Sequence, residues 1–98
     1  MAEPSGVLRR EMGFTRAEFM RILPSALHGY AYRVHDDSIL VEVSGSRVTI
    51  RLGQERIRQI ALLRLPCLDV EFDHAEVDEP AFRQFLRQFD LYYRKGGG

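Results

Sequence analysis

The sequence predicts an α+β fold: a two-layer sandwich with an N-terminal helix, an antiparallel sheet of four to five strands, and a C-terminal amphipathic helix on the same sheet face. Two observations predict it. Apolar residues repeat at helical spacing near both ends of the chain, and between them the apolar period changes to two, the spacing of half-buried strands. Consecutive strands joined by short turns form an antiparallel sheet, and the flanking helices cover one face of it.

Length and composition set the outer bounds. The 98 residues, 45% hydrophobic and 29% charged, are typical of one domain with a packed core. Fourteen basic residues balance fourteen acidic ones, so the overall field that attracts nucleic acid or anionic membranes is missing. The single cysteine, Cys67, permits no internal disulfide, and no apolar run suits a secretory signal or a membrane span. We expect a cytoplasmic protein that does not associate with membranes.

The start of the chain combines two kinds of sequence. Residues 1–12, "MAEPSGVLRREM", mix Pro, Gly and charge without a sustained period, so we expect a flexible N-terminal arm. A single folded domain, residues 13–95, follows and begins with a helix. Thr15 can cap the first turn of this helix, while Glu18, three residues on, reaches back to the Thr15 amide. Pro24 is expected to end or kink the helix.

The middle of the chain predicts strands. Period-two alternation and intervening turn residues mark three of them, at residues 30–35, 38–43 and 47–52. Residues 68–73, "LDVEFD", predict another half-buried strand. Residues 54–65 contain good helix formers, but Pro66 and this strand follow at once, so we expect a loop and a strand there. The face opposite the apolar one is expected to meet water.

Residues 78–95 predict the C-terminal helix. Asp78 is a good N-cap, and Pro80 follows at a position that opens helices. The apolar stripe of this helix consists of Phe82, Phe85, Leu86, Phe89 and Tyr93. Gly96 can take the left-handed conformation that ends a helix, and residues 96–98 are expected to form a flexible glycine tail.

The chain ends in "RKGGG". This end resembles that of sulfur-carrier and ubiquitin-like proteins, whose flexible Gly-Gly terminus enters an activating enzyme and presents its carboxylate for adenylation. The resemblance covers Gly97 and Gly98 alone. Those proteins have a β-grasp fold that opens with a β-hairpin, whereas here a helix is predicted first and another directly precedes the glycines. A frayed end is our main interpretation, and a carrier activated at its C-terminal Gly-Gly is the alternative.

The stretch "HGYAYRVH", residues 28–35, resembles in its first half the ribonucleoprotein motif of RNA-binding sheets. In that motif the aromatic side chains stand on the exposed sheet face and stack on bases. Here Tyr30 and Tyr32 lie on the same face of the predicted strand as Val34, so they are expected in the core. The order of elements also differs from that fold, so nucleic acid is not an expected partner.

Groups that could carry catalysis or bind a metal are sparse. His28, His35 and His74 are scattered along the chain and lack the spacing of zinc ligands. The Asp residues that follow His35 fit a turn better than an acid/base pair. Cys67 has no basic or histidine neighbour in sequence to activate it as a nucleophile. We therefore predict no enzymatic activity, no cofactor and no metal.

The polar sheet face is the predicted contact surface. Its residues form a basic group on the first strands and an acidic group on the last: Arg33, Arg47 and Arg51, then Asp69, Glu71 and Asp73. A surface divided in this way can steer a partner or self-associate. The sequence thus predicts a small non-enzymatic interaction or accessory domain, a monomer or weak homodimer, with a protein partner whose identity the sequence does not give. Besides the carrier, a small-ligand-binding domain is the alternative, with a pocket between the last helix and the sheet.

Overall fold

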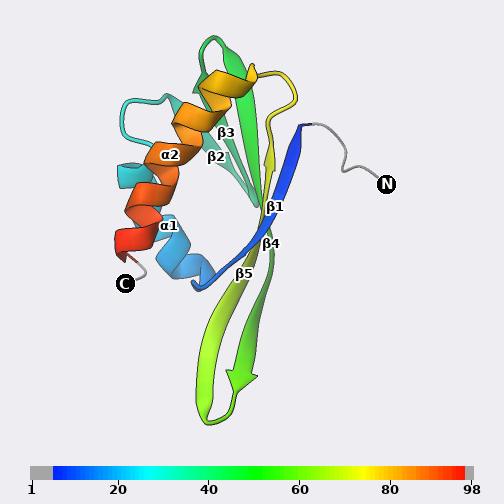
Figure 1. Cartoon of the computed structure of the whole chain (residues 1–98), viewed down its shortest axis with the longest axis vertical. Helices are drawn as coiled ribbons and strands as arrows, with labels where there is room; N and C mark the ends of the chain where they lie inside the picture. The colour runs from blue at the N-terminus through cyan, green and yellow to red at the C-terminus, as the bar shows by residue number, and fades with distance from the viewer. Residues whose placement is uncertain (1–5, 97–98) are drawn as a thin grey trace.

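The described part of the chain contains five strands and two helices. The computed structural model describes residues 6–96 and, for side chains, residues 6–94. In chain order the elements are β1 (Val7–Met12), α1 (Arg16–Ala26), β2 (Tyr32–His35), β3 (Ser38–Val43), β4 (Ser46–Ile60), β5 (Leu63–Asp73) and α2 (Glu79–Gly96). The strands form one antiparallel sheet in the order β1-β5-β4-β3-β2, with both helices on one face (Figure 1). The predicted two-layer α+β architecture is confirmed.

Strand β1 corrects the prediction of a flexible arm over residues 1–12. Val7–Met12 pair with β5 along the whole strand, with Leu8 opposite Phe72 and Met12 opposite Leu68. Leu8 and Met12 pack against the core, and the strand covers what would otherwise be an open edge of β5. The alternation of apolar and polar residues in this strand is hard to recognise in the sequence, because Arg10 occupies the inward-facing position between Leu8 and Met12. Residues 1–5 lie outside the described residues.

Helix α1 begins as predicted and ends later than predicted. Thr15 accepts a hydrogen bond from the Glu18 amide, and the Glu18 carboxylate accepts one from the Thr15 amide, which completes the capping box. Pro24 does not end the helix, because it lies inside a helix that continues to Ala26. Burial of the last turn, including Ala26 and Leu27, outweighs the single backbone hydrogen bond that proline removes.

Strands β2, β3 and β4 form the predicted meander. Ile39, Val41 and Val43 on β3 and Val48, Ile50 and Leu52 on β4 are buried, all on the face that the helices cover. Strand β2 begins at Tyr32 rather than at Tyr30. Both tyrosines pack against the core, as expected for side chains that do not form a base-stacking platform. Tyr30 meets Phe85 edge-on, with 5.2 Å between the ring centroids.

The expected loop within residues 54–65 is wrong, whereas the expected strand is present. Strand β4 continues to Ile60, and β5 begins at Leu63 after a turn in which Ala61 has φ 54°. A β-bulge between Leu52 and Glu55 shifts the register at the point where this extension begins. The two strands form a long hairpin that projects from the body of the molecule (Figure 1). We call residues 54–66 the hairpin arm.

Among residues 6–96, no other strand pairs with the arm on either side. The pairing of β3 with β4 ends at Ser38 opposite Arg51, and the pairing of β1 with β5 ends at Met12 opposite Leu68. Beyond these points β4 and β5 pair only with each other within the described residues. The arm is therefore a two-stranded ribbon, which in isolation would be marginally stable and here continues a sheet that is packed.

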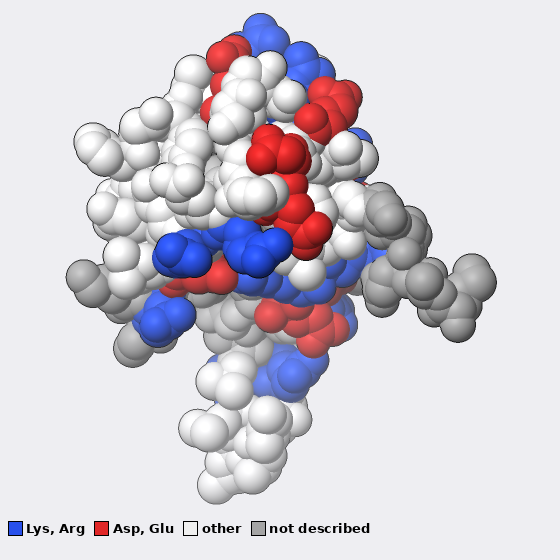
Figure 2. Space-filling view, turned by 45° about the horizontal axis from the view of Figure 1, so that its top comes forward, with Lys and Arg blue, Asp and Glu red and all other residues white. Residues whose placement is uncertain are grey.

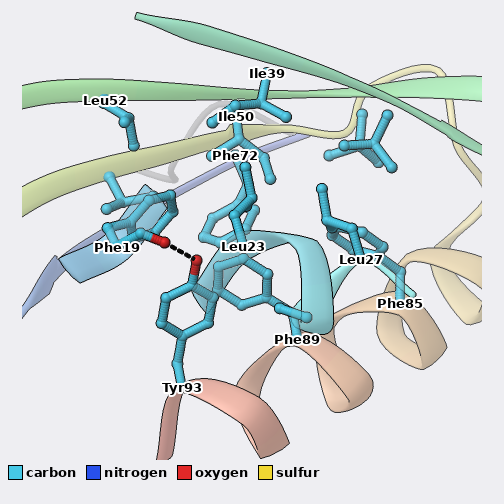
Figure 3. Packing of buried hydrophobic residues seen from close by; sticks show 14 of the residues in the cluster. Phe19, Leu23, Leu27, Ile39, Ile50, Leu52, Phe72, Phe85, Phe89 and Tyr93 are labelled. Atoms are coloured by element: carbon cyan, nitrogen blue, oxygen red, sulfur yellow. Dashed lines mark hydrogen bonds between the residues drawn. The ribbon is translucent and has the colours of Figure 1, made fainter. Parts of the chain in front are cut away.

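The core lies between the sheet and the two helices and is dominated by aromatic rings. Phe19 of α1 packs against Phe89 and Tyr93 of α2, and Phe72 of β5 meets Phe89 with 5.1 Å between the ring centroids (Figure 3). The Tyr93 hydroxyl donates a hydrogen bond of 2.8 Å to the Phe19 carbonyl, which satisfies a polar group inside the core. Burial raises the pKa of Tyr93 well above its usual value.

Helix α2 presents its predicted apolar stripe to the core. Phe82, Phe85, Phe89 and Tyr93 are buried, and Leu86 is partly buried against them. Gly96, predicted as part of a tail, is the last residue of this helix, while Gly97 and Gly98 lie outside the described residues. Neither described helix combines the length and apolar composition that crossing a membrane requires.

Candidate functional site

The hairpin arm carries most of the exposed apolar surface of the described chain. Five of the seven large apolar side chains that are exposed lie on it: Ile57 (53% exposed), Ile60 (51%), Leu62 (96%), Leu63 (62%) and Leu65 (42%). Together they expose the equivalent of about three whole side chains, on the order of 350 Å² of apolar surface. A contiguous patch of a few hundred Å² on a small protein marks an interaction surface. In Figure 2 the free end of the arm is white on the side that is shown.

The strand register assigns these side chains to two faces. We call the sheet face away from the helices the outer face. Ile60 and Leu63 are cross-strand partners on the outer face, and Leu65 follows two residues later on the same face. Ile57, opposite Pro66, lies on the other face of the arm, and Leu62 occupies the turn. The outer face of the arm is thus purely apolar at its end.

Ion pairs hold the base of the arm to β1 and β5. Arg56 Nη2 lies 3.2 Å from a Glu11 carboxylate oxygen and 2.5 Å from Asp69 Oδ1, and Arg58 pairs with the other Glu11 oxygen. The hydrogen bonds from Arg56 and Arg58 lower the pKa of Glu11, and the bond to Glu11 raises the pKa of Arg56. Two cations thereby face two carboxylates, and this joint is electrically balanced.

The same joint contains a group of potential metal ligands. Among the described residues, Glu11, Cys67 and Asp69 bring one ligand atom each within 4.8 Å of one another. Arg56 donates to both carboxylates and lies 3.7 Å from the Cys67 sulfur. A guanidinium therefore supplies the positive charge at the centre of the group, and the arrangement is that of an ion-pair network.

The six predicted contact residues lie on the outer face but do not form two separate zones. Arg51 stands opposite Glu71 in the register, with its Nη1 2.9 Å from Glu71 Oε2 and 3.5 Å from Asp73 Oδ2. Asp69 pairs with Arg56, and Arg9 of β1 reaches Glu71 at 3.1 Å. The acidic group on β5 is thus neutralised by arginines on both neighbouring strands.

Arg33 and Arg47 lie apart from these pairs. They line a hollow over β2, β3 and β4 that also includes Leu40 and Glu42. Glu42 stands opposite Arg47 in the register of β3 and β4. The structure therefore brings Arg51, Glu71 and Asp73 together, joins Asp69 to the base of the arm, and leaves Arg33 and Arg47 as a second, smaller basic region.

Sequence reasoning missed the arm as a site. The signal was present in "RIRQIALLRLP", where apolar residues recur without fitting either the helical stripe or the buried sheet face. Apolar residues that fit no buried face, in a stretch whose secondary structure the sequence does not define, indicate an exposed apolar hairpin.

No family model, no curated protein and no solved structure that was compared with this chain matches it. A functional inference therefore rests on chemistry: an apolar arm end, an ion-paired joint and a charge-compensated outer face. Of these features, the arm is the one that leaves a large apolar surface in water within the described chain.

Proposed function

We propose that the chain is a non-enzymatic, cytoplasmic protein-interaction domain whose contact element is the hairpin arm. The observation that supports this is the apolar surface at the end of the arm, with Leu62 96% exposed and its neighbours more than half exposed or nearly so. Leaving this surface in water forgoes roughly 9 kcal/mol of hydrophobic stabilisation that burial would give. A partner that covers the arm recovers that free energy.

The outer face contributes less to this proposal than the arm. Its charges are paired within the chain, as in the contacts of Arg51 with Glu71 and Asp73. Exposed pairs of this kind give small net stabilisation and are screened by salt. Their role in the proposal is to orient a partner at the rim, while the apolar arm supplies the affinity.

The small-ligand alternative stays a prediction. In the region expected for its pocket, between the last helix and the sheet, Phe72 packs against Phe82 and Phe89 with ring centroids 6.3 and 5.1 Å apart. The carrier alternative depends on Gly97 and Gly98, which lie outside the described residues, and it stays a prediction. Deleting these two glycines tests the carrier directly.

Comparative capture experiments test the interaction proposal. An N-terminally tagged chain is incubated with source-organism extract that also contains untagged copies of the chain, and retained proteins are identified by mass spectrometry. The arm variant Leu62→Asp/Leu63→Asp is compared with Leu91→Asp, a matched change at an exposed leucine of α2 (48% exposed). Circular dichroism checks that both variants fold.

The expected result is one or more proteins that the wild type and Leu91→Asp retain and the arm variant loses. Deletion of Gly97 and Gly98 should leave that set unchanged. An identical set for the wild type and the arm variant would refute the proposal. Loss of the set on deletion of the glycines alone would instead support the carrier.

A further inference from the structure

We infer that the arm binds a second copy of this chain, in a symmetric dimer in which each arm lies across the base of the other. This inference rests on the proposed function, because it names the partner of the same arm. Three features of the described residues carry it: an apolar knob, a hollow on the same face, and a balanced charge between them.

The knob is the end of the arm. Ile60 and Leu63 lie side by side on the outer face, and Leu62 extends beyond them at the turn. The nearest arginine on this face of β4, Arg58, is directed back to Glu11 and away from the tip. A surface that projects, is apolar and carries no charge needs a concave partner, because a flat one would leave part of it in water.

The hollow lies on the outer face where the arm joins the body. It has a volume of about 510 Å³ and is lined by residues of β1, β4 and β5, among them Arg9, Arg51, Gly53, Val70 and Glu71. Gly53 lies close to Asp69 on the neighbouring strand, because a Cβ at this position would lie only 3.1 Å from Asp69 Cβ. The chain thus contains on one face both a projecting element and a depression.

The geometry of knob and hollow is self-complementary. They are separated along the arm by the extended chain from Gly53 to Leu62, which spans about 30 Å. A two-fold axis that lies between the two outer faces, parallel to them and crossing the arm at right angles near its middle, places two arms antiparallel with these faces in contact. Each knob then reaches the hollow of the other copy, and both contacts form together, as in any isologous dimer.

The charges permit this contact. Near the middle of the arm, where two copies would cross, Arg56 and Arg58 are neutralised by Glu11 and Asp69 of their own chain. The whole chain carries a formal net charge of +0, so no long-range repulsion opposes association. An edge-to-edge pairing of two β4 strands centred on Ile57 would instead place Arg56 opposite Arg58 of the other copy.

The buried area predicts the strength of the dimer. The apolar side chains on the outer face and at the turn, Ile60, Leu62, Leu63 and Leu65, amount to about 600 Å² in two copies, and the surface of the two hollows that they cover adds about as much, so the total is close to the lower limit of about 1,200 Å² for specific interfaces. The dimer is therefore expected to be reversible and dependent on concentration, with a dissociation constant on the order of micromolar.

Sedimentation equilibrium of the full chain over micromolar to millimolar concentrations gives the first test. The wild type and the control Leu91→Asp should pass from monomer to dimer, and Leu62→Asp/Leu63→Asp should weaken the association at least tenfold. A wild type that stays monomeric throughout, or an arm variant that associates as well as the wild type, would overturn the inference.

Disulfide trapping tests the geometry in chains whose arm is otherwise intact. Under mild oxidation, Leu62→Cys in one copy should form a disulfide with Arg9→Cys in another, because Arg9 lines the hollow. Leu62→Cys alone should give no disulfide between two tips, since the tips lie at opposite ends of the dimer. Peptide mapping separates these bonds from any to Cys67. Abundant tip-to-tip disulfides would overturn the proposed arrangement.

The two proposals fail in different ways. A monomeric chain whose arm variant loses a different captured protein would refute the homodimer and leave the interaction function standing. An arm variant that changes neither sedimentation nor capture would refute both.

Discussion

At the scale of residues, the core contains a hydroxyl group inside an aromatic cluster and provides it with a hydrogen-bond partner. Tyr93 is 3% exposed, stacks on Phe19 with ring centroids 4.8 Å apart, and donates its hydroxyl proton to the Phe19 carbonyl. A phenol buried without a partner would destabilise the fold. The bond also joins α2 to α1.

Tyr93→Phe should lower the free energy of unfolding by about 1 kcal/mol, the usual net value of one buried hydrogen bond. Urea denaturation measures the change. Tyr92→Phe is the matched control, because it also removes a tyrosine hydroxyl, but from a side chain that is only partly buried. Equal stability of Tyr93→Phe and the wild type would mean that the bond contributes nothing measurable.

At the scale of elements, β1 decides where the folded domain begins. It contributes Leu8 and Met12 to the core, and its Arg10 donates two hydrogen bonds to Asp90 of α2. Arg10 also lies over the Phe72 ring, 5.5 Å from its centroid. Although Arg10 lies on the face of β1 that points to the core, the Asp90 carboxylate and the Phe72 ring accommodate its charge. Through Arg10, β1 also connects the sheet to α2.

Deletion of residues 1–12 should lower the free energy of unfolding by about 3 kcal/mol or more, because burial of Leu8 and Met12 is lost together with the pairing of β5. Urea denaturation and circular dichroism measure it. Arg9→Ala, an exposed change on the same strand, should stay within about 0.5 kcal/mol of the wild type. A deletion variant as stable as the wild type would restore the view of this segment as a loose arm.

At the scale of the whole molecule, the arm and the body are joined by the network around Glu11. The pKa of Glu11 is lowered in the folded chain from its ordinary value of 4.5, chiefly by the hydrogen bond from Arg56 and next by that from Arg58. A lowered carboxyl pKa means that the ionised form favours folding. This contribution is complete above about pH 4.5 and is lost as the pH falls through the lower folded value.

Glu11→Gln should therefore reduce the loss of stability that the wild type shows when the pH is taken from neutral to below 4.5. Urea denaturation at both pH values measures the difference. The difference in pH-dependent loss of stability between the wild type and Glu11→Gln should be smaller in high salt, because the charged groups are exposed and salt screens them. The same loss of stability in both chains would show that Glu11 does not stabilise the fold.

Much of the fold follows from the sequence because it is encoded locally. The capping box at Thr15 and Glu18 places the start of α1, and the stripe from Phe82 to Tyr93 places α2. The period of two in β3 and in residues 68–73 identifies half-buried strands and the face they bury. Each of these patterns is read from neighbours within a few positions along the chain.

The candidate site has no local pattern of this kind. In the arm, β4 and β5 pair with each other close in sequence, from Ile60 opposite Leu63 to Ile57 opposite Pro66, but both faces are exposed, so no alternation of buried and polar residues marks the strands. The charge pairs of the outer face follow from register, which sets Arg51 opposite Glu71 and directs Arg56 to Glu11.

The sequence by itself therefore determined the class of the fold, its helices, the meander and the core stripe, since periodicity and caps act over a few residues. The tertiary structure alone decided that residues 7–12 form an edge strand, that the chain projects an apolar arm, and which charges neutralise one another. The physical reason is that the pairing of β1 with β5 and the ion pairs join residues far apart in the chain, so their energies depend on a register that no local pattern contains. The arm pairs locally, but it buries neither face and therefore lacks the alternation that marks a half-buried strand.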